Sequence, residues 1–333
     1  MVAIRISPHD KVTIARIAEW RKCREDPVYF VSHYCKIYDP QAGDWIPFDL
    51  WQEQQDALTT IHDHQMTIVL KARQLGLSWL TLGYALWQML FTPIATVLIF
   101  SKREDESIYL LSEERMRGMY AHLPAWMRAE RVAVDSAKTW TLSNGSTARS
   151  FPSIGGDSYS ATCCIIDEAA ILPNLGKLLR SVKPTIDAGG KLIMISRANK
   201  DQPVSVFNST YRAAKAGKNG WVHIFLPWSV RPERDAAWYA RTRDDIVART
   251  GSDDDMKEQY PATDEEALAP SSQNKRIPAA WLETCLVAQK PLEAPGIHVP
   301  GLVVFREPEK FGQYVAGADC AEGLPSSDDS VTT

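Results

Sequence analysis

Short apolar runs recur along the middle of the chain, and segments with helical periodicity lie between them. The runs are MTIVL at 66–70, ATVLIF at 95–100, CCIID at 163–167, KLIMIS at 191–196 and WVHIFL at 221–226. Strands without polar alternation are buried on both faces, which is typical of a parallel sheet covered by helices. The sequence therefore predicts an α/β fold with a mainly parallel sheet and helices on both of its faces.

The remaining elements follow from periodicity and from breaker residues. Helices are predicted at 10–36, 50–63, 78–90, 103–121, 204–216 and 278–289, and further strands at 139–142, 147–151, 302–305 and 314–319. Asn144-Gly145 favours a tight hairpin turn between two of these strands. We expect one domain over 1–268, a Pro-containing linker region over 269–300 and the start of a second domain over 301–333.

Composition narrows the functional classes. The chain is 45% hydrophobic and 23% charged, and no apolar run approaches the roughly 18 residues that span a membrane, so no membrane partner is expected. Six cysteines without a CxxC pair and seven histidines without HExxH indicate neither a disulfide framework nor a metal site made of protein side chains alone. A net charge of −4 argues against strong autonomous binding to nucleic acid, although a local basic cluster suffices for transient contacts.

The segment KARQLGLS at 71–78 lies between a predicted strand and a predicted helix, the position of a nucleotide-binding loop in an α/β sheet. In the pattern GxxxxGK[ST], Gly76 and Ser78 match, whereas Lys71 stands at the first glycine and Leu77 at the lysine. Lys71 would reach the phosphates from the loop entrance, Gly76 would permit the tight turn and Ser78 would bind Mg²⁺. The loop residues expected around ATP also include Ala72, Arg73, Gln74 and Leu75. An ordinary strand, turn and helix with a lysine that reaches solvent would share this spacing.

An acidic pair follows the apolar run at 163–167. Asp167 and Glu168 would emerge at the carboxyl end of a parallel strand, beside the loop. Asp167 would hold Mg²⁺ through water, and Glu168 would orient and activate the attacking water. Adjacent acids also occur at helix N-termini for reasons of the helix dipole alone, but the loop and the acidic strand together favour nucleotide hydrolysis.

Taken together, these residues resemble the ATPase domain of the large terminase subunits of tailed bacteriophages, which is a P-loop NTPase of the ASCE type. The segments PFDLWQEQQDAL, ARQLG, IIDEAA and EQYPATDEEAL occur in the family's order and cover nearly the whole chain. The resemblance implies ATP-driven translocation of double-stranded viral DNA into a procapsid. It also implies ATP and Mg²⁺ as cofactors, and as partners the portal protein, the small terminase subunit and further copies of the chain in a ring. The expected location is the host cytoplasm, with transient docking on the procapsid.

The resemblance assigns further roles residue by residue. Gln52 would read the adenine, since an amide both donates and accepts hydrogen bonds, and Arg73 would sense the γ-phosphate during catalysis. Ser196 and Asn199, in ISRAN, would couple hydrolysis to movement. A surface position for Gln52 and a simple strand end at 195–199 are the alternatives.

Many relatives carry an arginine just before the acidic strand that acts on the ATP of a neighbouring subunit. Here that place holds IGGDSYSA at 154–161, without an arginine. Arg149 is the nearest candidate for this catalytic role.

The segment YVAGADCAEG at 314–323 resembles the first strands of the family's RNase-H-like nuclease. Asp319 would be its first metal-binding carboxylate. Cleavage with two divalent metals needs several carboxylates, and their positions would follow Thr333, so endonuclease activity on concatemeric DNA is expected in a longer chain.

Two other functions share part of this pattern. A helicase-like ATPase would also carry an upstream glutamine, a phosphate loop and an Asp-Glu pair, but would lack a nuclease start at Asp319. A scaffold component would bind nucleotide at the loop without hydrolysing it.

Overall fold

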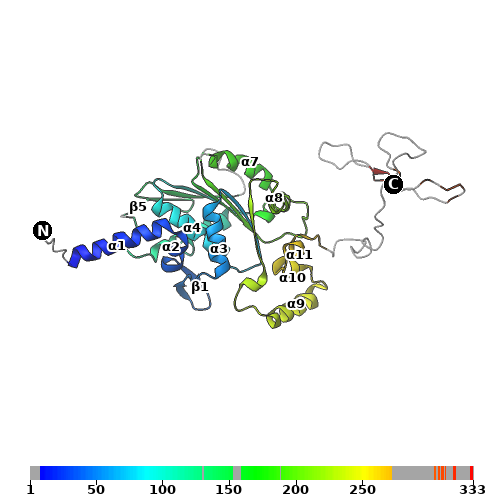
Figure 1. Ribbon diagram of the computed structural model, residues 1–333, viewed down its shortest axis with the longest axis horizontal. Helices are drawn as coiled ribbons and strands as arrows, with labels where there is room; N and C mark the ends of the chain where they lie inside the picture. The colour runs from blue at the N-terminus through cyan, green and yellow to red at the C-terminus, as the bar shows by residue number, and fades with distance from the viewer. Residues whose placement is uncertain are drawn as a thin grey trace. The chain divides into compact units, whose positions relative to one another are not determined.

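The computed structural model describes residues 8–129, 131–152, 159–187 and 189–271, and a few positions between 304 and 332 (Figure 1). Its contacts group the chain into residues 1–274 and 275–333. In the second group, β11 (Ala318–Asp319) pairs antiparallel with β12 (Val331–Thr332). The expected helix at 278–289, most of the expected strand at 302–305 and most of the linker at 269–300 lie outside the described residues, so the domain boundaries stay a prediction.

An eight-stranded sheet forms the centre of the first group, in the order β10-β3-β9-β8-β4-β7-β6-β5. The first six strands of this order run parallel, and β6 and β5 are antiparallel additions at one edge. The strands span Val222–Leu226 (β10), Met66–Lys71 (β3), Lys191–Ser196 (β9), Cys163–Asp167 (β8), Thr96–Phe100 (β4), Thr147–Phe151 (β7), Thr139–Leu142 (β6) and Val132–Ser136 (β5). Strand β9 therefore lies between the strand before the predicted loop and the strand that carries the acidic pair.

Successive residues of the central strands enter two different cores. In β3, Val69 packs into one core and Ile68 and Leu70 into the other, as expected for strands whose side chains alternate between faces. Helices α2 (Pro27–Tyr34), α3 (Gln52–Asp63), α4 (Leu77–Phe91), α5 (Glu104–Leu111) and α6 (Met116–Ala121) contribute to the first core. Helices α7 (Leu175–Ile186), α8 (Val206–Lys215) and α11 (Asp264–Leu268) contribute to the second (Figure 1). The predicted α/β fold with helices on both faces is confirmed.

Two predicted helices are wrong as single elements. The segment 10–36 divides into α1 (Pro8–Glu25) and α2, because Asp26 caps α2 by accepting a hydrogen bond from Tyr29 N at 2.9 Å and Pro27 begins it. The segment 103–121 divides into α5 and α6, with a turn over 112–115 between them. By contrast, the hairpin at Asn144-Gly145 is confirmed, with Gly145 at φ +86°.

Several elements were not predicted from the sequence. A small hairpin joins β1 (Lys36–Asp39) to β2 (Asp44–Pro47), and α7 lies between the acidic strand and β9. After β10, the chain forms α9 (Ala236–Thr250), α10 (Asp254–Gln259) and α11. Helix α10 and the segment before α9 matter for the site, because Gln259 and Arg234 contact the predicted phosphate loop.

Candidate active site

The predicted phosphate loop connects β3, which ends at Lys71, to α4, which begins at Leu77. Gly76 takes the left-handed conformation at φ +69°, and a Cβ added there would lie 2.9 Å from Gln54 Nε2. The glycine is therefore required both by the turn and by a close neighbour. Ala72 N donates to Leu226 O at 2.9 Å, which ties the loop to the end of β10.

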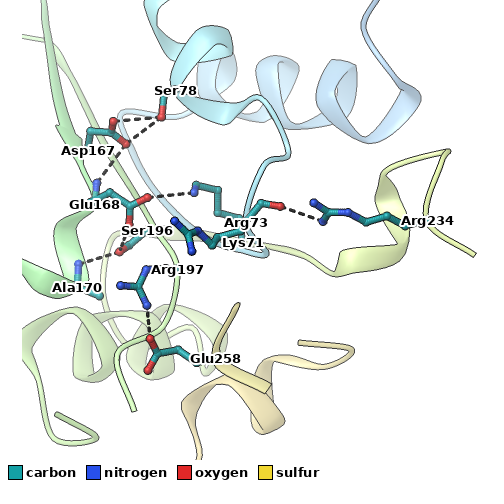
Figure 2. Close-up of polar contacts among 10 residues, drawn as sticks. All are labelled: Lys71, Arg73, Ser78, Asp167, Glu168, Ala170, Ser196, Arg197, Arg234 and Glu258. Carbon is teal, nitrogen blue, oxygen red and sulfur yellow. Dashed lines mark hydrogen bonds and ion pairs between the residues drawn. The ribbon is translucent and has the colours of Figure 1, made fainter. Parts of the chain in front are cut away.

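Lys71 is buried at the start of the loop. Its Nζ lies 3.3 Å from Glu168 Oε1, and the Lys71 side chain is 7% exposed against 30% for Glu168 (Figure 2). The two strands β3 and β8 are separated by β9, so this ion pair crosses the carboxyl ends of three neighbouring strands. The displaced lysine thus points toward the acidic pair, as a loop lysine that serves phosphates would.

Asp167 ends β8 and faces the first turn of α4. Ser78 Oγ donates to its carboxylate, at 3.2 Å from Oδ1 and 3.1 Å from Oδ2 (Figure 2). Burial raises the pKa of Asp167, and the neighbouring charge of Glu168 raises it further, while Lys71 and the Ser78 hydrogen bond act in the opposite direction. The site therefore concentrates negative charge that a cation would stabilise.

Glu168 has an unusual backbone, with φ +50° in the left-handed region. A non-glycine residue in that region is uncommon and costs free energy, and such residues cluster at functional sites. The Glu168 side chain contacts Lys71 through Oε1, and its Oε2 lies 3.5 Å from Ser196 Oγ at the end of β9. Ser196 Oγ also accepts from Ala170 N at 3.0 Å, so the end of β9 is joined to the segment after the acids.

The middle of the loop is held by residues that sequence analysis did not single out. Arg234 donates from Nη1 to Arg73 O at 2.9 Å and from Nη2 to Gln74 Oε1 at 3.1 Å. Gln74 itself has φ +60°, so these bonds support a strained position. The Arg73 side chain donates to Gln259 Oε1 at 2.9 Å, and Arg73 N donates to Gln259 O at 2.8 Å. Only the tertiary fold brings these residues from beyond β10 to the loop.

Asn199, the second predicted coupling residue, does not join this cluster. Its Oδ1 accepts from Asp201 N at 3.2 Å within a local turn. The neighbouring residues contact α10 instead: Arg197 forms an ion pair with Glu258, and Lys200 N donates to Glu258 Oε2 at 2.9 Å. Glu258 and Gln259 are adjacent, so α10 contacts both the end of β9 and the loop.

Gln52, the predicted adenine-binding residue, is exposed at the first position of α3. Its Nε2 donates to Asp56 Oδ1 at 2.8 Å, within the same helix. Gln54 is the glutamine of this segment that contacts the loop, through a buried bond from Nε2 to Leu75 O at 2.9 Å. The sequence holds three glutamines at 52–55, and the residue pattern does not distinguish which of them faces the loop.

Arg149 lies on β7, which is separated from the acidic strand by β4. Its Nη1 donates to Thr139 Oγ1 at 3.3 Å, and its guanidinium lies 4.8 Å from the centre of the Tyr159 ring. It lines a cavity of about 270 Å³ with Lys138 and Phe151, and the phosphate loop does not contribute to that cavity. Arg149 is thus not part of this chain's own cluster, and action on a neighbouring subunit stays a prediction.

A second cavity, of about 210 Å³, lies directly over the acidic pair. Ser78, Asp167 and Glu168 line it together with Glu106 and Tyr109 of α5 and Arg115 of the turn before α6. Arg115 was not expected from the sequence.

The donor atoms at this cavity suit Mg²⁺ bound together with a nucleotide. The Ser78 hydroxyl and the Asp167 carboxylate are hard oxygen ligands, and they lie 3.1 Å apart. Mg²⁺ usually takes one or two protein ligands and completes its shell with phosphates and waters, and among the described residues no group of three or more His, Cys, Asp and Glu side chains gathers as a metal cage. The residue types therefore fit a metal that arrives with phosphates.

Comparison with known proteins shows which fold this is. No family model matches the chain. The crystal structure of the large terminase of bacteriophage HK97 superposes with a TM-score of 0.57 and 16% identity, over 82% of this chain. The chain has the fold of a phage large terminase. The predicted P-loop fold of the ASCE type is thereby confirmed, with β9 inserted between the loop strand and the acidic strand.

This terminase-fold chain covers 60% of the length of the HK97 protein. The ATPase domain of the Thermus phage P74-26 large terminase aligns at 16% identity over 61% of this chain and 90% of that one, with a TM-score of 0.47. The large terminase of a thermophilic bacteriophage in complex with ATP-γ-S aligns at 16% identity over 58% of this chain and 48% of that one, with a TM-score of 0.41. In the described part of the terminase-fold chain, no helix has both the length and the apolar character of a membrane span.

Proposed function

We propose that this chain is the motor ATPase of a terminase large subunit, which hydrolyses ATP to ADP and phosphate and thereby moves double-stranded viral DNA into a procapsid. The observation that carries the proposal is the convergence of Lys71, Ser78, Asp167 and Glu168 at one edge of a terminase-fold sheet. Cation, hydroxyl and two carboxylates are the side-chain groups that phosphoryl transfer in P-loop enzymes uses.

Each residue of this cluster has a distinct task in the proposed reaction. Lys71 binds the phosphates, and the backbone N–H groups of 72–78 surround them. Ser78 and Asp167 would hold Mg²⁺, which would neutralise phosphate charge when bound. Glu168 orients a water and accepts its proton as the water oxygen attacks the γ-phosphorus and the bond to the ADP oxygen breaks.

The ion pair between Lys71 and Glu168 gives this reaction an ordered start. With the phosphates absent, the ammonium group neutralises the carboxylate at 3.3 Å. ATP offers the same ammonium a stronger set of anions, so binding would release Glu168 to the water. Ser196, at 3.5 Å from the second oxygen of Glu168, would then transmit that change to β9.

The wider assembly follows from the same proposal. The portal protein, the small terminase subunit and neighbouring copies in a ring are the proposed partners, in the host cytoplasm and at the procapsid. A chain of net charge −4 makes few phosphate contacts alone, and a ring multiplies them through effective concentration. In this proposal Gln52 reads the adenine, Asn199 takes part in coupling and Arg149 acts on the ATP of a neighbour. Asp319 belongs to the two-metal nuclease of a longer chain.

Turnover measured against protein concentration, with and without procapsids and double-stranded DNA, tests the proposal. We expect low ATPase activity for the free chain and a rise when DNA and procapsids promote the ring. A high rate that is independent of all three would contradict the motor and leave a self-sufficient ATPase. Nucleotide binding with no hydrolysis under any condition would favour the scaffold.

A further inference from the structure

Arg115 presents a guanidinium group to the cavity over the acidic pair, from a part of the chain that carries no recognised motif. It ends the turn between α5 and α6. Its guanidinium carbon lies 4.3 Å from the centre of the Trp79 ring and 4.8 Å from that of Tyr109. Trp79 directly follows Ser78, so the same turn of α4 that supplies the predicted metal ligand also positions this arginine.

Contact with two aromatic rings holds a guanidinium in place without consuming its donors. Cation–π attraction acts through the ring faces, whereas the N–H groups of arginine lie in its own plane. Among the described residues, the Arg115 guanidinium has no hydrogen-bond acceptor and no ion-pair partner, and its Nε is buried in that state. Burying an unpartnered donor costs free energy, and a guanidinium that also has no acceptor at its other nitrogens is suited to bind an anionic ligand.

The acidic side chains of the same cavity all have partners already. Glu168 pairs with Lys71, Asp167 accepts from Ser78, and Glu106 lies 3.1 Å from Arg103 Nε. Arg115 is therefore not needed to neutralise any of these carboxylates. The N–H groups of Arg115 are therefore available to bind an anion from outside the protein.

The other groups of the cavity indicate which anion this is. The volume of about 210 Å³ admits a phosphoryl group and several waters, since one water occupies about 30 Å³ in the liquid. Three carboxylates around the cavity would repel a bare polyanion such as a DNA backbone. A phosphate that arrives with Mg²⁺ would bring its own neutralising charge, and Arg115 lines the same cavity as Ser78 and Asp167, which would hold that metal.

We propose that Arg115 is a catalytic arginine acting in cis, whose N–H groups bind the γ-phosphate oxygens of ATP as the bond to ADP breaks. This inference rests on the proposed ATPase function. As the water oxygen bonds to phosphorus and its proton passes to Glu168, negative charge shifts toward the leaving ADP oxygen and the equatorial oxygens. Arg115 stabilises that charge from within the same subunit, and Arg149 of a neighbour keeps its separate proposed role.

The test uses the full chain with Arg115→Gln and Arg115→Lys. Removing an arginine that acts in the transition state should lower kcat by about 100-fold or more, while the Kd for ATP stays within about threefold. Binding of ADP with aluminium fluoride, which imitates the transferring phosphoryl group, should weaken in parallel with kcat. Arg115→Lys keeps the charge but not the planar fork, so its kcat should lie between those of the unmodified chain and Arg115→Gln. Added guanidinium ion should restore part of the kcat of Arg115→Gln.

Arg117→Gln is the matched control. Arg117 lies two residues further on, and its guanidinium already has partners in Asp135, at 3.4 Å, and Ser136 O. Its loss should lower thermal stability, while kcat and the affinity for ADP with aluminium fluoride stay within about twofold of the unmodified chain. A purely structural role for Arg115 would give this same result.

The outcomes separate this inference from the proposed function. If Arg115→Gln and Arg115→Lys keep kcat within about twofold of the unmodified chain while Lys71→Ala abolishes hydrolysis, the arginine assignment is wrong and the ATPase stands. Loss of DNA binding with unchanged kcat would likewise overturn the assignment. If the unmodified chain hydrolyses no ATP even with DNA and procapsids, both proposals are wrong.

Discussion

At the loop, a lysine that departs from the motif in sequence lies close to the acidic pair in space. Lys71 stands where the pattern expects glycine, yet its ammonium group lies at 3.3 Å from the acid that would activate water. Leu77 stands where the pattern expects lysine, and it is buried in the apolar core. In the proposed function, the long side chain of Lys71 would serve the phosphates from the end of β3.

Alanine substitutions at these two positions should affect different properties, ATP binding at Lys71 and stability at Leu77. Lys71→Ala should weaken ATP binding by at least about tenfold, because the phosphates lose their buried cation. Leu77→Ala should lower the free energy of unfolding by about 2–5 kcal/mol through the cavity it leaves, with little change in ATP affinity per folded molecule. Isothermal titration with ATP and urea unfolding of both variants provide the measurement. Equal and mild effects on ATP binding would count against a phosphate loop.

At the scale of elements, the strands were predictable and the supports of the loop were not. The strands at 163–167 and 191–196 match their predicted bounds, because a run that is apolar on both faces has few alternatives to a buried strand. The division of the predicted helix 10–36 into two could also be inferred from the sequence, since Asp26-Pro27 is a helix start signal. Gln54, Arg115 and Arg234 reach the site through tertiary packing from elements far along the chain, and no local pattern marks them.

The segment after β10 should therefore influence nucleotide binding. Arg234→Gln removes two hydrogen bonds to the loop, each from a charged group and worth about 1.5–3 kcal/mol, and we expect the ATP KM to rise by about tenfold or more. Arg231→Gln is the control, because Arg231 is engaged mainly with Glu233 and approaches Gln74 O at 3.4 Å. Steady-state kinetics of both variants would decide; the same KM in the two would contradict a bracing role for Arg234.

Helix α3 contains a group that should make the fold sensitive to acid. Burial lowers the pKa of His62, and the nearby charge of Lys191 lowers it further, while its Nδ1 lies 3.4 Å from the Tyr84 hydroxyl. A histidine whose folded pKa is depressed contributes stability that is fully present above its unfolded pKa of about 6.5 and is lost as the pH falls through the folded pKa. His62→Gln should therefore lose less stability than the unmodified chain between pH 7.5 and pH 5. Urea unfolding at both pH values tests this, and an equal loss in the two proteins would contradict it.

For the whole molecule, the order of the strands brings the phosphate loop, the acidic pair and α10 into contact. Placing β9 between β3 and β8 puts Ser196 between the loop and the acids, and the residues after Ser196 contact α10. Helix α10 in turn contacts Arg73, so the loop, the acidic pair and α10 form one connected set. Such a set could pass a change at the phosphates to the rest of the chain, as the proposed motor requires.

The substitution Glu168→Gln tests whether Glu168 activates the water that hydrolyses ATP, which is the main step of the proposed function. The substitution keeps the shape of the side chain but removes the base and the competing partner of Lys71. We expect ATP affinity that is equal to or tighter than that of the unmodified chain, together with turnover lower by about 100-fold or more. Parallel measurement of the ATP Kd and the single-turnover rate gives both quantities. Hydrolysis at the unmodified rate would contradict the account.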